Sequence, residues 1–294
     1  MLRVNFDARD VNSSMSLLAE THAKRYLQQV MARDSTQRWL DSLPARGRAT
    51  FTLADAVADL GVSEKAASMA VGRLRRRGLV ASPSRGFYLV IPPEYRALGS
   101  LPAIEFVDPL LGWLGVPYYV GLLSAAALHG SAHQRPQRFQ VVVPKNRRSI
   151  ELGEVAVDYV ARADMGRVPI ETRNTRMGTV RVSTAEATAL DLVGNADRCA
   201  GLDHVATVLA ELAEAMRPER LAEAAKPSPI AWVQRLGWLL ERVDQGELAA
   251  ALDSEVGTRA HAPAPLVRSA PTAGAERSVR WRLIINAHVE PDEL

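Results

Sequence analysis

The basic side chains of this chain are concentrated in two segments. Residues 63–96 carry seven Lys and Arg against two Glu, and residues 135–148 carry five with no acid, so each segment has a net charge of +5. The whole chain has 36 Lys and Arg against 33 Asp and Glu, a net of +3, so the remainder carries −7. Two basic segments in an otherwise acidic chain indicate a localised surface for a polyanion, although two solvated faces would give the same counts.

The first basic segment is predicted to belong to a unit in which two helices, separated by a tight turn, are followed by a hairpin. Each helix begins at a capping residue, Thr52 for the first and Ser63 for the second, and a glycine ends it. The predicted elements, in order, are helices 14–33 and 37–43, strand 50–51, helices 53–60 and 63–77, and a hairpin over 79–91. This order is that of a winged helix-turn-helix.

The helix over 63–77 has the two faces expected of a helix that reads DNA. At 3.6 residues per turn one face is apolar, formed by Ala67, Ala70, Val71 and Leu74. The N-terminal half of such a helix meets base edges in the major groove. We therefore expect sequence readout by Lys65, Ser68, Met69 and Arg73. Phosphate contacts, which give affinity but little sequence information, are expected from Arg75, Arg76, Arg77 and, at the hairpin tip, Arg85.

Beyond a linker at 98–102 the pattern changes to a mixture of helices and strands. The predicted elements are helices 106–114 and 119–129, strands 139–143, 155–161, 168–172 and 179–182, helices 185–193, 202–215, 229–243 and 247–252, and a final strand 281–286. The chain is therefore predicted to be α+β with two domains, residues 1–97 and 98–294. The second basic segment flanks strand 139–143, and we expect it to extend the DNA surface through Arg135, Arg138, Lys145, Arg147 and Arg148.

Four stretches of the chain resemble the AbiEi-family antitoxins of abortive-infection, type IV toxin–antitoxin systems. They are LGVSEKAASMAVGRLRRRGLV (60–80), YYVGLLSAAALHG (118–130), STAEATALDLV (183–193) and WVQRLGWLLE (232–241). The first is common to winged helices in general, whereas the order and spacing of the other three are more specific. The family usually has a basic residue after the Glu of the third stretch, where this chain has Ala187.

The resemblance implies a non-enzymatic repressor of its own operon, without a cofactor. It implies that the protein is monomeric in solution and binds double-stranded DNA at inverted repeats in its promoter, often cooperatively. It further implies that the second gene of the operon encodes a nucleotidyltransferase-like toxin. The C-terminal domain would counteract that toxin, without a stable complex between the two proteins as the rule.

Motifs of the enzyme classes considered are absent from the sequence. His129 and His133 have a spacing that binds zinc on a helix, but Gly130 ends the predicted helix and no third ligand is near. The Gly130-Ser131 pair is not followed by the paired carboxylates that hold magnesium in a nucleotidyltransferase. Neither a Gly-x4-Gly-Lys-Ser/Thr loop nor a Gly-x-Ser-x-Gly elbow occurs. Cys199 is predicted to be a structural thiol, and we expect neither a metal nor catalysis.

The composition favours a folded protein of the cytoplasm. Hydrophobic residues make up 47% and charged residues 23%, which excludes bulk disorder, and the single cysteine excludes an intramolecular disulfide framework. Residues 109–134 hold no charged side chain over a length that could span a bilayer. Glycines and Pro117 interrupt this stretch, so we expect two short buried helices and no membrane contact. The first residues lack the apolar core of a secretory signal.

One other class of protein shares these features. An interaction or sensor protein could use its winged helix to dock on another protein, and arginines at a helix C-terminus also complement the helix dipole. Salt-dependent binding to DNA separates the two classes, because a docking module would bind duplexes weakly and without sequence preference.

Overall fold

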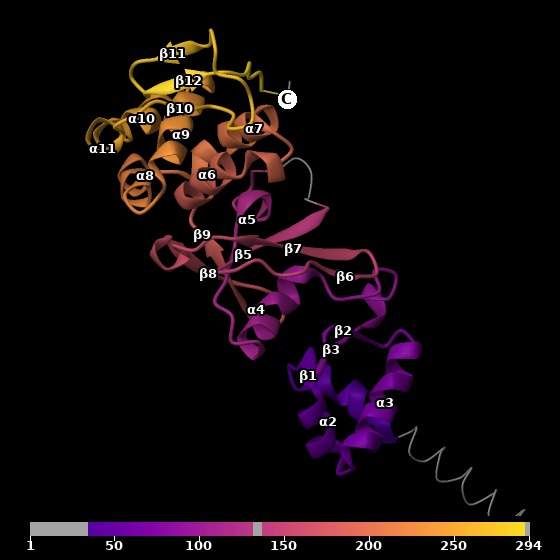
Figure 1. Ribbon diagram of the computed structural model, residues 1–294. Coiled ribbons are helices and arrows are strands. Elements are labelled where there is room, and N and C mark those ends of the chain that lie inside the picture. The colour runs from indigo at the N-terminus through magenta and orange to yellow at the C-terminus, as the bar shows by residue number, and fades with distance from the viewer. Residues whose placement is uncertain (1–34, 132–136, 292–294) are drawn as a thin grey trace, which may run out of the picture. The chain divides into compact units, whose positions relative to one another are not determined.

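The computed structural model describes residues 35–131 and 137–291 and divides the chain into two compact units (Figure 1). The first unit ends at Arg96 and the second begins at Ala97. The helix predicted over 14–33 and the side chains of Arg135 and His133 lie outside the described residues.

The N-terminal unit has the element order of a winged helix-turn-helix. Residues 35–45 are helical, and a short 3-10 helix, η1 (Pro93–Tyr95), follows the hairpin. Between them lie β1 (Thr50–Thr52), α2 (Leu53–Leu60), α3 (Glu64–Arg76), β2 (Val80–Ser84) and β3 (Phe87–Val90). The three strands form an antiparallel sheet in the order β1-β3-β2, so the hairpin is extended by β1 at its β3 edge.

Local capping sets the bounds of α2 and α3, as the sequence predicts. The Thr52 side chain accepts the Asp55 backbone N–H at 3.1 Å, and Asp55 accepts the Thr52 N–H at 2.7 Å, which completes the capping box. Gly61 ends α2 in the left-handed conformation with φ +63°. Ser63 then caps α3 by accepting the Ala66 N–H.

The hairpin predicted over 79–91 has a two-residue turn in the structure. Strand β2 continues to Ser84, with an irregular register between Ala81 and Ser84 around Pro83. A proline cannot donate a ladder hydrogen bond, so it is tolerated where the pairing is interrupted. The tip of the hairpin is therefore only Arg85 and Gly86, and Gly86 has φ +87°.

An aromatic cluster joins the elements of the N-terminal unit. The ring of Phe51 meets Trp39 edge-on at 4.9 Å between centroids and stacks on Tyr88 at 5.2 Å. The Trp39 Nε1–H donates to Asp59 of α2 at 3.0 Å. The four apolar residues predicted to face inward from α3 are all buried, and Ala67, Val71 and Leu74 belong to the same core.

The C-terminal unit is built on a six-stranded mixed sheet in the order β6-β7-β5-β4-β9-β8. Its strands are β4 (Tyr119–Val120), β5 (Arg138–Val143), β6 (Ile150–Leu152), β7 (Val155–Ala161), β8 (Ile170–Asn174) and β9 (Thr179–Ser183). Helix α4 (Ala103–Trp113) lies on one face of the sheet and α5 (Leu122–Leu128) on the other (Figure 1). No helix within the described ranges is long and apolar enough to cross a membrane.

The helix predicted over 119–129 is wrong at its start. Residues Tyr119 and Val120 form β4, which pairs with β5 on one side and β9 on the other, and α5 begins only at Leu122. Tyr119 and Val120 fit a helical pattern and a strand pattern equally well over so short a run. Pairing with strands far along the chain decides between them.

A helical layer and a small second sheet complete the C-terminal unit. The helices are α6 (Ala185–Gly194), α7 (Leu202–Leu212), α8 (Pro218–Ala225), α9 (Ile230–Arg242), α10 (Gly246–Ala250) and α11 (Asp253–Arg259). Three short 3-10 helices are η2 (Met165–Arg167), η3 (Ala196–Arg198) and η4 (Ala213–Ala215). The small sheet contains β10 (Ala264–Pro265), β11 (Glu276–Ser278) and β12 (Leu283–Ile285) in the order β10-β12-β11. The sequence did not indicate α8, α11, β6, β10 or β11.

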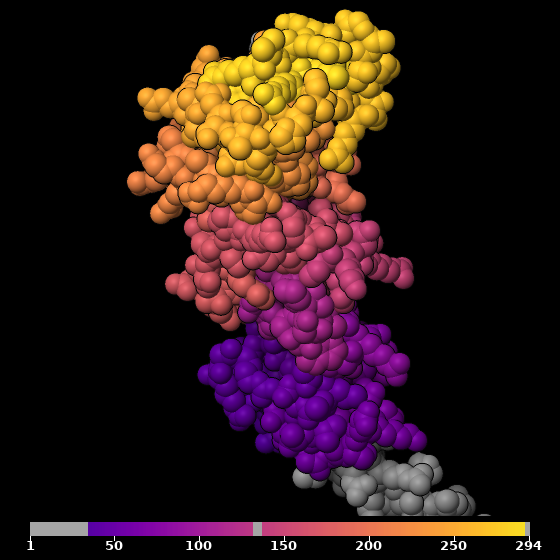
Figure 2. Space-filling model, turned by 60° about the vertical axis from the view of Figure 1, so that its left-hand side comes forward, coloured from indigo at the N-terminus to yellow at the C-terminus, as the bar shows by residue number. Residues whose placement is uncertain are grey.

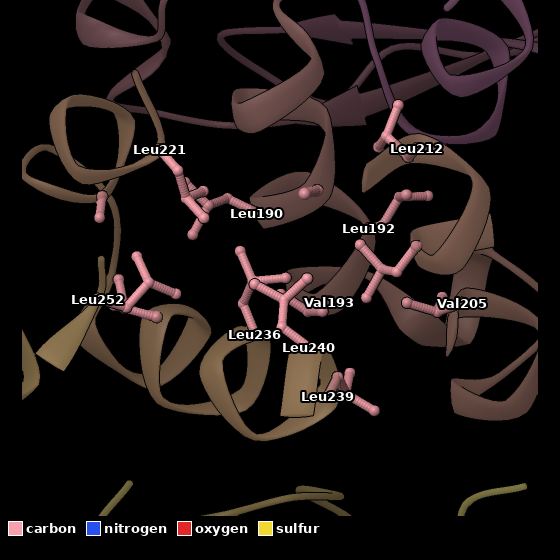
Figure 3. Close-up of a cluster of buried hydrophobic side chains, with 14 of the residues drawn as sticks. Leu190, Leu192, Val193, Val205, Leu212, Leu221, Leu236, Leu239, Leu240 and Leu252 are labelled. Atoms are coloured by element: carbon pink, nitrogen blue, oxygen red, sulfur yellow. The ribbon is translucent and has the colours of Figure 1, made fainter. Parts of the chain in front are cut away.

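The helical layer lies between the two sheets of this unit, with the small sheet forming the yellow end in Figure 1 and Figure 2. Leucine and valine side chains from α6, α7, α8 and α9 converge in its centre (Figure 3). They include Leu190, Leu192, Val193, Val205, Leu212, Leu221, Leu236, Leu239 and Leu240. This core is made mainly of aliphatic side chains, as the low aromatic content of the chain implies, and Tyr119, Trp238 and Trp281 are its buried aromatic members.

Candidate nucleic-acid interface

Helix α3 presents two different faces. Its inner face is fixed by Ala67, Ala70, Val71 and Leu74, all buried against the rest of the N-terminal unit. The opposite face is polar and open to solvent. The fixed inner face therefore determines which side chains α3 can offer to a ligand, and the capped N-terminus determines where that surface begins.

The side chains predicted to read bases lie at the exposed N-terminal half of α3. Lys65 and Ser68 are exposed, and Met69 is 58% exposed, an unusual position for a large apolar side chain. Further along the helix, a Cβ added at Gly72 would meet no atom within 4 Å, so the approach there is unobstructed. This surface can offer an ammonium group, a hydroxyl and a thioether to the edges of base pairs.

Arg73 lies on the flank of this face and is half-buried. It lines a hollow of about 570 Å³ together with Arg76, Arg77 and two residues of the helix over 35–45, Thr36 and Gln37. Two elements of the N-terminal unit thus meet beside the basic end of α3. The sequence gives no signal for this hollow, because the two segments are more than thirty residues apart.

The three consecutive arginines at the end of α3 are all exposed. Within the described ranges, the side chains of Arg75, Arg76 and Arg77 form no hydrogen bond or ion pair. Arg48 behaves differently, because it pairs with Asp59 at 3.1 Å and Asp55 at 3.3 Å. The positive charge at the end of α3 is therefore available to an external anion.

The tip of the hairpin provides one further basic group. Arg85 is exposed and occupies the two-residue turn between β2 and β3 with Gly86. It too has no side-chain partner in the part of the chain that the structure describes. The wing therefore ends in an available guanidinium.

The second basic segment differs from the first. Arg138 donates through Nε to Asp158 at 2.7 Å and through Nη2 to Asp158 and Glu151, at 2.9 and 3.3 Å. Strands β6 and β7 bring these carboxylates to Arg138, although the segment itself contains no acid. The Arg138 guanidinium holds the pKa of Asp158 below its usual range. Arg138 is thus internally neutralised, and an external role for it is not favoured.

Three exposed members of the second segment have no carboxylate partner among the described residues: Lys145, Arg147 and Arg148. They follow β5, and the guanidinium of Arg147 lies over the ring of Tyr159 at 6.0 Å. This part of the C-terminal unit keeps a basic surface, although a smaller one than the residue count suggests.

His129 and Cys199, the residue types here that could bind a metal or act in catalysis, contact internal groups of the C-terminal unit. His129 interacts with the Ser183 carbonyl through Nε2 at 2.8 Å, and the Arg173 guanidinium donates to its Nδ1 at 2.8 Å. Because Arg173 can only donate, Nε2 carries the proton, and burial lowers the pKa of the ring. Cys199 is buried, which raises its pKa to about 12. No group of three or more metal-ligating side chains occurs among residues 35–131 and 137–291.

Comparisons with known proteins agree with the two-part organisation. Residues 40–91 match the family described as transcriptional regulator, AbiEi antitoxin, and residues 119–242 match the AbiEi antitoxin C-terminal domain. No curated protein matches the chain. The crystal structure of the RV2827C protein from Mycobacterium tuberculosis is similar, with a TM-score of 0.58 and 18% identity over 84% of this chain and 90% of that one. At that identity the likeness shows a shared fold alone.

An N-terminal regulator domain with an exposed basic helix, followed by an α+β domain, defines a transcriptional regulator of the DNA-binding class. The chain belongs to the AbiEi antitoxin family, which confirms the resemblance seen in the sequence. Its role is accordingly that of a DNA-binding antitoxin.

Proposed function

We propose that the N-terminal unit recognises a specific sequence of double-stranded DNA by placing α3 in the major groove. The observation that carries this proposal is the exposed, unpaired face of α3 opposite a fully buried one. Lys65 would donate to guanine acceptors, and the Ser68 hydroxyl would either donate to an acceptor or accept from a donor at a base edge. The exposed thioether of Met69 fits an apolar contact with a thymine methyl group, and Arg73 would act from the flank of the helix.

The basic end of α3 and the wing would hold the DNA backbone. Arg75, Arg76, Arg77 and Arg85 are exposed and have no internal counterion in the described ranges, so binding phosphate costs them no existing ion pair. Such contacts give affinity and steep salt dependence on any sequence. Base recognition is thus assigned to the N-terminal half of α3, and phosphate binding to its C-terminal end.

We further propose that the DNA target is a set of inverted repeats in the protein's own promoter, and that the partner gene encodes a nucleotidyltransferase-like toxin. Family membership supports both parts, and a protein that binds its own promoter would act in the cytoplasm. The test is a reporter gene under the protein's own promoter. Wild-type protein should repress it and Lys65→Ala should repress it less, whereas equal expression with and without protein would contradict autoregulation.

The antitoxin role has a separate test. Co-expression of the wild-type chain with the neighbouring gene should restore growth that the neighbouring gene alone arrests. Lys65→Ala should restore growth equally, because the resemblance to the family assigns neutralisation of the toxin to the C-terminal unit. Failure of both proteins to restore growth would contradict the assignment of the toxin.

The exposed part of the second basic segment would lengthen the DNA footprint. Lys145, Arg147 and Arg148 remain exposed, whereas Arg138 is held by carboxylates. Reversing the charges with Arg147→Glu and Arg148→Glu should weaken DNA binding and make its salt dependence shallower by about 2 in log–log slope. An unchanged affinity and slope would restrict the interface to the N-terminal unit.

A further inference from the structure

One edge of the large sheet of the C-terminal unit is a regular strand with a free side. The strand order places β6 and β8 at the two edges (Figure 1). Strand β6 has three residues, whereas β8 has five and pairs with β9 in an antiparallel register without a shift. Natural edge strands are commonly protected by a proline, a bulge or a lysine, and β8 contains none of these. Strand β8 can therefore accept another strand along its free side.

The hydrogen bonds that flank β8 determine which of its backbone groups point away from β9. Before the strand, the Thr184 N–H donates to the Pro169 carbonyl at 3.1 Å. After it, the Thr175 N–H donates to the Gly178 carbonyl at 2.8 Å. Because bonded and non-bonded pairs alternate in an antiparallel ladder, the odd-numbered residues of β8 bond to β9. The residues whose N–H and C=O groups point to the free side are Ile170, Thr172 and Asn174.

The side chains of β8 alternate between the two faces of the sheet. On one face Glu171 and Arg173 form an ion pair at 2.6 Å, and the two side chains are 39% and 33% exposed. On that face Arg173 also contacts Leu128 and His129 at the end of α5. The side chains on the other face are exposed, including that of Ile170 at 46%. The free side of β8 therefore carries one acidic and one basic side chain that another strand can meet.

These two charges select one register for antiparallel pairing of β8 with a second β8. A two-fold axis at Glu171 would place the two glutamates opposite each other, and an axis at Arg173 would do the same with the arginines. Like charges directly opposite each other destabilise a strand pair. An axis at Thr172 instead places Glu171 of each copy opposite Arg173 of the other, and opposite charges in such pairs are favourable. The same register joins all three outward-facing residues of each copy, with about six N–H···O=C hydrogen bonds.

We propose that β8 pairs with the β8 strand of a second copy of this chain, antiparallel and centred on Thr172, so that the two large sheets become continuous. A contact of five residues from each copy buries far less than the roughly 1,200 Å² at which stable complexes begin. The association is therefore weak, and a dilute solution holds single chains, as the resemblance to the family implies. The surface belongs to the C-terminal unit, and the proposal does not depend on operator recognition.

The first test is sedimentation equilibrium of the full chain without DNA, from about 5 µM to about 500 µM. The average mass should rise with concentration from that of one chain toward that of two. The mass of a single chain over the whole range would overturn the proposal and would leave operator recognition untouched.

A charge exchange then tests the register. Glu171→Arg alone and Arg173→Glu alone should each remain monomeric, because each variant places like charges opposite each other. An equimolar mixture of the two should associate again, since every Arg then meets a Glu. If both variants have the circular dichroism of the wild type and their mixture remains monomeric, the register is wrong and the proposal fails.

Two further variants keep the test valid if Arg173→Glu fails to fold without its contacts to α5. Thr172→Pro removes an N–H that points to the free side and leaves the bonds to β9 in place, so self-association should weaken at least tenfold. The matched control is Glu151→Arg on β6, the same change of charge at the opposite edge, which should associate as wild type. Wild-type association of Thr172→Pro, or an equal loss in Glu151→Arg, would overturn the proposal.

Discussion

The two units use their arginines in opposite ways. On α3 and the wing of the N-terminal unit, the arginines are left without internal partners within the described ranges. In the C-terminal unit, arginines connect distant segments: Arg138 holds Asp158, Arg162 holds Asp191, and Arg280 holds Asp253 at 2.7 Å. The arginines of α3 and the wing are therefore available to an external ligand, whereas these three arginines of the C-terminal unit hold internal carboxylates.

The difference shows why charge counted along a sequence overestimates a binding surface. The two basic segments have equal net charge in the sequence, yet pairing of β5 with β7 brings Asp158 next to Arg138. An arginine that already has a carboxylate must lose that pair before it can bind phosphate. Available charge, rather than net charge, separates the candidate interface from the rest of the surface.

The largest expected effect is on the buried ion pair. Arg162→Leu leaves Asp191, which is 1% exposed, without its counterion, so the C-terminal unit should lose about 3–5 kcal/mol of unfolding free energy. Urea unfolding followed by circular dichroism measures this. The control is Arg138→Leu at an exposed pair, for which a loss of about 1 kcal/mol or less is expected. If the two variants lost equal unfolding free energy, the buried and the exposed ion pair would contribute equally to stability, which would contradict this prediction.

The second effect concerns the end of α3. Replacing Arg75, Arg76 and Arg77 together by Ala should weaken DNA binding on the order of a hundredfold and make the log–log salt slope shallower by about 3. Operator and random DNA should be affected alike, because phosphate contacts carry little sequence information. Fluorescence anisotropy at several salt concentrations measures both quantities, and an unchanged slope would mean that these arginines do not contact phosphate.

A smaller and more selective effect is expected at the other end of α3. Lys65→Ala should cost about 1–3 kcal/mol on the operator and much less on a scrambled duplex, because it removes a contact to a base edge. The measurement is the ratio of the two dissociation constants in wild type and variant. If both duplexes lose affinity equally, Lys65 is a phosphate contact. The division of α3 into a base-contacting N-terminal half and a phosphate-contacting C-terminal end would then be wrong.

The smallest effect is expected at Arg138, and it depends on pH. Because Arg138 lowers the pKa of Asp158 in the folded state, the pair stabilises the fold above about pH 4 and this contribution is lost as the pH falls through the lowered pKa. Arg138→Gln should therefore destabilise by about 1 kcal/mol or less at pH 7, and its effect should shrink as the pH falls through the lowered pKa of Asp158. Its DNA affinity at pH 7 should equal that of wild type; a tenfold loss would place Arg138 in the interface.

Local signals predicted the N-terminal unit well and the C-terminal unit less completely. The Thr52–Asp55 box, the Ser63 cap and the apolar face of α3 involve residues close in sequence, so they can be recognised without the rest of the chain. By contrast, the strand at Tyr119 is decided by partners far away, and α8 and α11 are short helices whose burial depends on α6 and α9.

The same reasoning applies to the sites. The exposed positions on α3 follow from helical spacing, and the structure places Lys65, Ser68 and Met69 as the spacing predicts. The Arg138 pair and the Arg162–Asp191 pair could not be foreseen, because their members are 20 and 29 residues apart and join only through tertiary structure.

The central claim is that α3 reads a particular DNA sequence. The most direct test is a titration of the full chain against labelled DNA from upstream of its own gene and a scrambled duplex of equal length, at two salt concentrations. Sequence recognition by α3 predicts tight binding that prefers the upstream DNA and falls steeply with salt. Weak binding that ignores sequence would contradict it and would make the winged helix a surface for protein partners.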